Sequence, residues 1–157
     1  MNLEIKQLSS EDMDLLLSLR MEVLSHVFAR ERQVMTEEKW QALAEENRRY
    51  YQQELANGGH IASVALLDGK IAGCGGLCLY KEMPSPDNPS GLCGYLMNIY
   101  TRKAYRQQGI ARKVCVWLIE KAQKRGAGKI YLETSTVGRH LYQSIGFHEM
   151  KDYLKLD

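Results

Sequence analysis

The sequence predicts an α+β fold, in other words a mixed α/β domain, and two observations lead to this prediction. Some segments have apolar residues at helical spacing, whereas others have short apolar runs bounded by glycine or proline. Along the 157 residues these segments follow the order strand, helix, helix, three strands, helix, strand, helix, strand (βααβββαβαβ). A chain of this length is expected to form one domain over residues 1–157, with a sizeable core.

The N-terminal part of the chain predicts one strand and two helices. Residues 3–8 contain the apolar residues of a short strand, and the serines at 9–10 stand ahead of acidic residues as helix caps do. Apolar residues at helical spacing then continue to Leu24. A second helix is predicted from Thr36, because acidic residues follow it directly and favour the positive end of the helix dipole. Glycines at 58–59 end this helix.

A β-hairpin is predicted next. Its strands lie near 60–67 and 70–80, and the Asp68-Gly69 pair between them is typical of a tight turn. Glycines between 73 and 76 interrupt the second strand, which indicates a bulge or the close approach of another backbone.

The C-terminal half begins with a loop at 84–91, which contains all three prolines of the chain. Residues 92–101 show little alternation, as expected for a strand that is buried on both faces. The remaining predicted elements are a helix that ends at Gly126, a strand at 129–134, a small helix that stops at Gly146 and a last strand at 147–156.

Composition and charge exclude several classes of protein. Hydrophobic residues make up 45% and charged residues 25% of the chain, and the formal net charge of +2 is too small to indicate nucleic-acid binding. The four cysteines have neither the spacing of a zinc site nor that of a disulfide framework, so they are expected to be reduced core residues, with no metal bound. No signal-peptide run and no membrane-length apolar stretch is present, which predicts a cytoplasmic protein without a membrane partner.

The segment with the clearest chemistry is the basic loop at 102–113, between a predicted strand and a predicted helix. It has five cations among twelve residues, and Gly109 stands just before the helix. A helix N-terminus offers unpaired backbone N–H groups, and a glycine lets the chain turn so that they point at one anion. Such a site suits a pyrophosphate or another multiply charged phosphate. The five cations are Arg102, Lys103, Arg106, Arg112 and Lys113.

A basic loop of this kind has other interpretations. The glycine and lysine spacing of a P-loop is absent, and so is the G-x-G-x-x-G pattern of a dinucleotide-binding fold. By itself the loop is as consistent with a solvated surface as with a phosphate site. A nucleic-acid patch would show more net charge and interleaved aromatic residues.

With a second motif downstream, the loop resembles the cofactor motif of the GNAT superfamily of acyl-CoA N-acyltransferases. That motif is Arg or Gln, two residues, Gly, one residue, then Gly or Ala, and Arg106, Gly109 and Ala111 match it. The run L-Y-Q-S-I-G-F at 141–147 is similar to a late signature of the same family. The order of elements matches over essentially the whole chain. The resemblance implies the GNAT fold, with a central, mostly antiparallel sheet whose fourth and fifth strands splay apart.

The resemblance also implies acetyl-CoA as the acyl donor. Backbone N–H groups after Arg106 would hold the pyrophosphate, and the end of the fourth strand would lie along the pantetheine arm. The N–H of Ile99 or Tyr100 would face the thioester carbonyl, and one such donor contributes about 3–4 kcal/mol to lowering a barrier. The implied cofactor-binding residues are Ile99, Tyr100, Thr101, Arg106, Gln107, Gln108, Gly109, Ile110, Ala111 and Arg112.

Two catalytic residues are expected. Tyr142 matches the family tyrosine that protonates the departing thiolate, and a phenol pKa near 10 suits that task; the alternative is an aromatic that only packs. Glu133, in the predicted fifth strand, resembles a catalytic base of the ribosomal-protein acetylating members, although their asparagine is replaced by Ser135 and the connection to the tyrosine is shorter. A solvated glutamate, or a water relay through the backbone near Asn98, remains open as an alternative.

The function predicted is that of an N-acetyltransferase. It would move an acetyl group from acetyl-CoA to a primary amine of a small molecule or peptide, by direct attack in a ternary complex. The alternative is a non-catalytic CoA-sensing or protein-binding module. Exposed edge strands could also pair into a homodimer. The first two helices and the loop before residue 92 are expected to select the acceptor. Their charged residues include Arg20, Glu22, Arg30, Glu31, Glu82 and Asp87.

Overall fold

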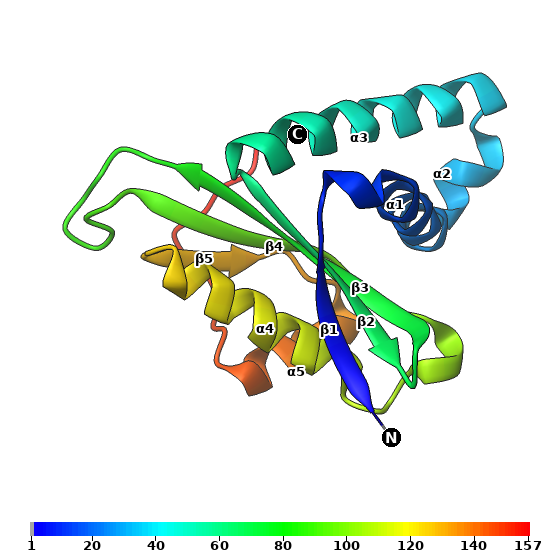
Figure 1. The fold of residues 1–157 in the computed structure, drawn as a ribbon. Helices are drawn as coiled ribbons and strands as arrows, with labels where there is room; N and C mark the ends of the chain where they lie inside the picture. Colours follow the sequence, from blue (N-terminus) through cyan, green and yellow to red (C-terminus); the bar gives the residue numbers. More distant parts are fainter. Residues whose placement is uncertain (1) are drawn as a thin grey trace.

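A mixed β-sheet lies at the centre of the computed structural model, which describes residues 2–157 (Figure 1). Over these residues the five strands lie in chain order, β1 to β5. Strands β1 to β4 pair antiparallel, whereas β5 runs parallel to β4. The predicted mostly antiparallel sheet is therefore confirmed. The strands are β1 (Leu3–Leu8), β2 (His60–Leu67), β3 (Lys70–Lys81), β4 (Leu92–Thr101) and β5 (Lys129–Leu132).

Helices cover both faces of the sheet, with α1 and α3 on one face and α4 and α5 on the other (Figure 1). A capping box between Ser9 and Asp12 and a Thr36 side chain that caps α3 confirm the helix starts expected from the sequence. The helices are η1 (Ser10–Asp12), α1 (Met13–Val27), α2 (Ala29–Val34), α3 (Glu37–Asn57), η2 (Lys103–Tyr105), α4 (Ile110–Lys124) and α5 (Thr136–Ile145). None of the helices within the described part is both long and apolar enough to cross a membrane.

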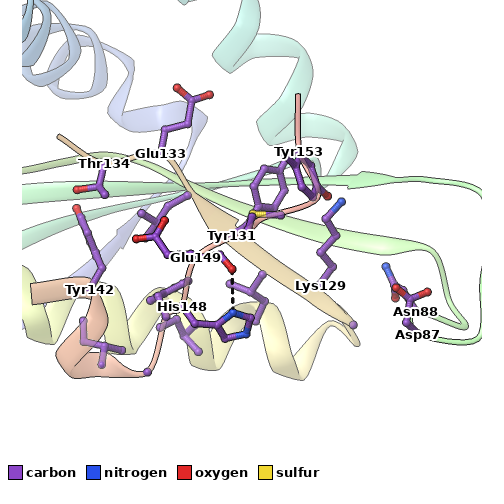
Figure 2. A pocket seen from close by; sticks show the side chains of 18 of the residues that line it. Asp87, Asn88, Lys129, Tyr131, Glu133, Thr134, Tyr142, His148, Glu149 and Tyr153 are labelled. Carbon is purple, nitrogen blue, oxygen red and sulfur yellow. Dashed lines mark hydrogen bonds between the residues drawn. The ribbon is translucent and has the colours of Figure 1, made fainter. Parts of the chain in front are cut away.

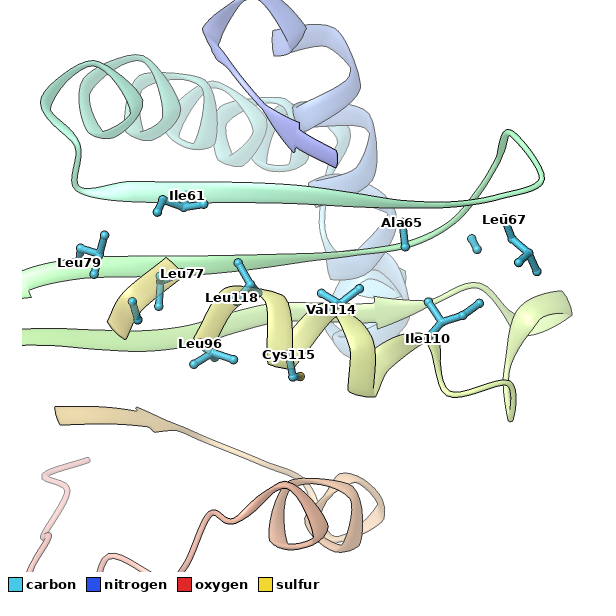
Figure 3. Packing of buried hydrophobic residues seen from close by; sticks show 12 residues of the cluster. Ile61, Ala65, Leu67, Leu77, Leu79, Leu96, Ile110, Val114, Cys115 and Leu118 are labelled. Carbon is cyan, nitrogen blue, oxygen red and sulfur yellow. The ribbon is translucent and has the colours of Figure 1, made fainter. Parts of the chain in front are cut away.

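Strand β2 separates two apolar cores because its side chains alternate between the layers. Ile61 and Ala65 pack against α4, whereas Ala62 and Val64 pack against α1 and α3. The α4 core is shown in Figure 3. Because both faces of the sheet are apolar at its centre, each face is covered by a layer of helices.

The glycines of β3 permit helix α4 to lie directly on the strand. A Cβ atom at Gly75 would be 2.5 Å from Val114 Cγ1 and 2.9 Å from Leu118 Cδ1. At Gly73 it would be 2.4 Å from the carbonyl oxygen of Tyr100 on β4. The predicted close backbone approach is therefore confirmed. Asp68 and Gly69 both have positive φ, 50° and 79°, as the tight hairpin turn requires.

Three expectations from the sequence need correction. The last strand, predicted at 147–156, does not form: Leu154 and Leu156, which should supply part of its apolar face, are fully exposed. Strand β5 ends at Leu132 rather than at Thr134. Helix α2 was not predicted, and it forms a short exposed turn of polar residues between the two expected helices.

The free cysteines follow the expectation for core residues at three of four positions. Cys74, Cys93 and Cys115 are buried, and Cys78 is half-buried. Burial raises the pKa of the Cys115 thiol to about 12, so this group stays protonated and unreactive at neutral pH.

His60 belongs to a buried polar cluster at the start of β2. Its Nδ1 atom lies 2.8 Å from the Tyr50 hydroxyl, which lies 3.0 Å from Cys78 Sγ. The Tyr50 and Tyr51 rings pack edge-on against the imidazole. Burial, and then the positive charge of Arg20, lowers the pKa of His60 to about 4. The imidazole is therefore neutral at physiological pH.

This low pKa predicts a loss of stability in acid that depends on His60. Unfolded histidine takes up a proton near pH 6.5, and the folded cluster resists it down to about pH 4, so the stabilisation is complete above 6.5 and is lost as the pH falls towards 4. Between neutral pH and about pH 4.5 the loss amounts to about 2–3 kcal/mol. In urea titrations at both pH values, the free energy of unfolding of His60→Gln should not show this part of the decrease in acid. His148→Gln, at an exposed histidine, should retain it, and equal acid slopes for all three proteins would contradict the assignment.

Candidate functional site

A bulge in β4 at Asn98 shapes the centre of the sheet. The register between β3 and β4 shifts there, so that Gly75 faces two residues, Asn98 and Ile99. Asn98 has a φ of 60°, in the left-handed region that asparagine tolerates better than most residues. The extra residue sends Met97 and Asn98 both towards the α1 and α3 layer, while Ile99 still packs in the α4 core. The sequence predicted a bulge or a close backbone approach in the glycine segment of β3, and the pairing of β3 with β2 does shift register at Ala72. Asn98 was named only for a water relay.

Strands β4 and β5 separate just before the bulge. Their last paired residues are Leu96 and Leu132, and β4 continues to Thr101. Among residues 2–157, no strand covers that edge of β4 over 97–101. An uncovered edge presents backbone N–H and C=O groups that an extended ligand can pair with. The predicted splay is therefore present.

The basic loop lies between the end of β4 and helix α4. Gln107 and Gly109 both have positive φ, 63° and 77°, and they bracket a turn that leads into Ile110, the first residue of α4. No side chain of residues 2–157 caps this helix start, so its first N–H groups remain available. A Cβ atom on Gly109 would meet nothing, which shows that the backbone angle and not crowding requires glycine here. The loop could hold a polyphosphate.

Two arginines flank this helix start without a carboxylate partner in the described chain. Arg106 Nε donates to the carbonyl oxygen of Thr101 over 3.0 Å, which ties it to the end of β4. Arg112 Nη1 donates to Ser144 Oγ over 2.8 Å, which ties it to α5. Both guanidinium groups are exposed and keep their positive charge uncompensated within residues 2–157.

Arg102, counted with the same cations in the sequence, has a different role. Its guanidinium binds both carboxylate oxygens of Glu22 on α1, at 2.9 and 3.0 Å. The hydrogen bonds from Arg102 lower the pKa of the Glu22 carboxyl. This ion pair fixes α1 to the end of β4, and it removes Arg102 from the cations free to bind an anion.

Tyr142 is half-buried on α5, beside a groove of about 950 Å³ between β5, α5 and the C-terminal segment. Its ring packs edge-on against Phe147, with ring centres 6.2 Å apart. Figure 2 shows its hydroxyl directed towards Thr134. Burial, with a smaller effect of Cys115, raises the pKa of Tyr142 to about 12. The phenol therefore holds its proton at neutral pH.

Glu133 follows the last residue of β5 and is exposed. Figure 2 shows its carboxylate on the side of the helices that cover the other face, away from Tyr142. Burial, and then the Glu133 carboxylate, raise the pKa of Tyr95 to about 12. The two predicted catalytic side chains thus extend to opposite sides of the sheet at the point where β5 leaves β4.

A second cavity, of about 290 Å³, lies between the α1 and α3 layer and the sheet. It includes Asn98 of the bulge, and Arg20 bridges its walls: Nη1 donates to Asn98 Oδ1 over 2.9 Å, and Nε donates to Asn47 Oδ1 over 3.0 Å. The sequence contained one signal for this cavity, because Arg20 interrupts the apolar stripe of α1 between Leu16 and Leu24. The other lining residues come from distant segments and were missed.

The family model described as "Acetyltransferase (GNAT) family" matches residues 24–147. A protein named "Uncharacterized N-acetyltransferase YjgM", from Escherichia coli strain K12, is 29% identical over 122 residues, which is 76% of this chain and 69% of that protein. A solved structure described as a predicted acetyltransferase with acetyl-CoA, from Clostridium acetobutylicum, has a TM-score of 0.83 and 26% identity over 99% of this chain and 96% of its own.

A third similarity concerns the fold alone. An aminoglycoside acetyltransferase from an uncultured soil metagenomic sample has a TM-score of 0.74 at 22% identity, and the match covers 100% of this chain and 99% of that one. The family model covers every element from the end of α1 to α5, including the basic loop and the helix of Tyr142. The chain therefore belongs to the GNAT family of acetyltransferases.

Proposed function

We propose that the protein is an N-acetyltransferase that uses acetyl-CoA and acetylates a primary amine of a small molecule or peptide. The observation that carries the proposal is the uncovered edge of β4, which leads directly into the uncapped start of α4 with two unpaired arginines beside it. The similarity to a Clostridium acetobutylicum structure with acetyl-CoA supports this donor. We also propose that residues 1–157 act as a single acetyltransferase domain.

The donor would bind along a line of backbone groups. The N–H groups of residues 107–111 would hold the pyrophosphate, with charge from Arg106 and Arg112, and the pantetheine arm would pair with residues 99–101.

The proposed reaction needs a proton acceptor and a proton donor. The neutral amine attacks the thioester carbon, the C–S bond breaks, and the N–H of Ile99 or Tyr100 stabilises the oxyanion. Tyr142 gives its proton to the departing thiolate, and with a pKa of about 12 the phenol is in the protonated form at neutral pH. The proton of the ammonium form passes either to Glu133 or, in the alternative route, to a water held at the backbone near Asn98.

Acetyl transfer itself can be tested with purified protein, acetyl-CoA and a panel of primary amines. Free thiol should appear together with the acetylated amine, which mass spectrometry identifies. A protein that binds acetyl-CoA tightly but transfers acetyl to none of the amines would be a CoA-sensing module, and the proposed activity would be wrong.

Charge reversal of the two unpaired arginines should abolish donor binding. The double variant Arg106→Glu, Arg112→Glu places two carboxylates beside the pyrophosphate, and affinity for CoA measured by calorimetry should fall at least about 100-fold, since each lost charge-assisted bond accounts for roughly tenfold or more. The matched control, Lys39→Glu with Lys124→Glu, changes the net charge equally at exposed positions on α3 and at the far end of α4. Unchanged affinity in the first variant would refute the phosphate site.

Removal of one phenol should separate donor binding from turnover. In Tyr142→Phe, kcat should fall about 10²–10⁴-fold, as expected for loss of a general acid, with little change in CoA affinity. Tyr80→Phe makes the same chemical change at an exposed tyrosine on β3 and should leave kcat unaltered. Similar kcat values for Tyr142→Phe and the unmodified protein would show that this ring only packs.

A further inference from the structure

The 290 Å³ cavity beside the β4 bulge contains a cation without a counter-ion. Arg20 is half-buried, and its two hydrogen bonds go to the neutral amide oxygens of Asn47 and Asn98. Its Nη2 donates to no described residue, and Arg20 makes no ion pair within residues 2–157. Removing a charge from water without a partner is costly, so a guanidinium in this position is poised for an anion.

The carboxylates near Arg20 are already bound elsewhere. Glu46, at the rim of the cavity, pairs with Arg49, and both side chains are mostly exposed. Glu22, two residues along α1, is held by both arms of Arg102. Glu54 accepts a hydrogen bond from Asn57 at the end of α3. The positive charge of Arg20 therefore faces the cavity uncompensated.

The pKa values of neighbouring groups support this positive potential. Arg20 is the second cause, after burial, that lowers the pKa of His60, and it opposes the effect of burial on the pKa of Tyr51 and Cys78. His60 is neutral at physiological pH, so it adds no charge of its own. The remaining walls consist of aromatic rings and of the sulfur side chains of Cys78 and Met97.

The cavity adjoins the proposed reaction centre. Asn98 accepts from Arg20 on the cavity side and, in the bulge, is followed by Ile99, whose N–H is proposed to face the thioester. An anion on Arg20 would therefore lie next to the edge of β4 where the amine must attack. A cavity of this size is at the lower end of the range for small-molecule pockets, which favours a compact acceptor.

We propose that Arg20 binds the carboxylate of the acceptor, and that the acceptors are free amino acids or other compact amines with a carboxylate close to the amino group. This inference rests on the proposed acetyltransferase function and names its substrate class. The Nη2 group of Arg20, which no described residue binds, can donate charge-assisted hydrogen bonds to a carboxylate. A phosphate dianion would call for a second cation, which the described lining lacks. Polyamines and protein N-termini, which have no carboxylate near the amine, are excluded from this class.

The test compares acids with their matched carboxamides. L-Leucine and L-phenylalanine are offered beside L-leucinamide and L-phenylalaninamide, and both acetyl transfer and binding to the protein saturated with CoA are measured. For the unmodified protein, kcat/KM and affinity should favour each acid over its amide by about 10- to 100-fold, the usual effect of a charge-assisted pair. Equal values for acid and amide would overturn the inference without any variant.

Variants assign the preference to Arg20. Arg20→Met keeps the length of the side chain but removes its charge, and the preference for the acid should fall below about threefold while CoA affinity is retained. Arg48→Met, on the same helical layer but outside the cavity lining, should retain the preference. A preference that persists in a folded Arg20→Met protein would overturn the assignment.

The two proposals fail in different ways. Acetylation of acids and amides at equal rates leaves the acetyltransferase function intact and refutes the role of Arg20. Selective binding of the acids without transfer to any amine supports the role of Arg20 and refutes the proposed enzymatic function.

Discussion

One extra residue in β4 determines which side chains at the centre of the sheet point towards each layer of helices. Side chains of a strand alternate strictly, so a regular β4 would send Asn98 into the α4 core and Ile99 towards α1 and α3. The bulge reverses this: Ile99 packs under α4, and the polar Asn98 reaches Arg20. A β-bulge also twists and bends its strand, and β4 leaves β5 immediately after Leu96. The gap between the strands and the cavity beside it thus have a common origin.

The arginines around β4 divide into two groups because of their partners. Arg102 is neutralised by Glu22 and fastens α1 to the end of the strand. Arg106, Arg112 and Arg20 make hydrogen bonds to neutral oxygens only, so they keep their charge while their positions are fixed. The first two lie at the start of α4, and the third lies in the cavity. The proposed donor site and the proposed acceptor site therefore each contain uncompensated positive charge, although the chain as a whole is nearly neutral.

The glycines of β3 allow α4 and β4 to pack closely on the strand, and this packing holds the proposed donor site in position. Gly75 lets Val114 and Leu118 of α4 press directly on the sheet, and Gly73 lets β4 approach closely at Tyr100. The start of α4 is held in place through this packing, so the N–H groups of its first turn point in a fixed direction. A preorganised group of donors loses little freedom when an anion binds, which is what a cofactor site requires.

Much of this protein can be predicted from local sequence. Periodicity and turn residues determine the five strands and four of the five α-helices, since a cap such as Thr36 or a turn such as Asp68-Gly69 acts within a few residues. The chemistry of the basic loop is also local, because Gly109 and its neighbouring cations are adjacent in the chain.

The tertiary structure alone decided the rest. Whether residues 147–156 become a strand depends on a buried face that other segments must provide, and here none does within the described chain. Which arginine is free depends on carboxylates many residues away, as the pairing of Arg102 with Glu22 shows. The cavity of Arg20 arises where two helices and three strands meet, and no local pattern encodes such long-range contacts.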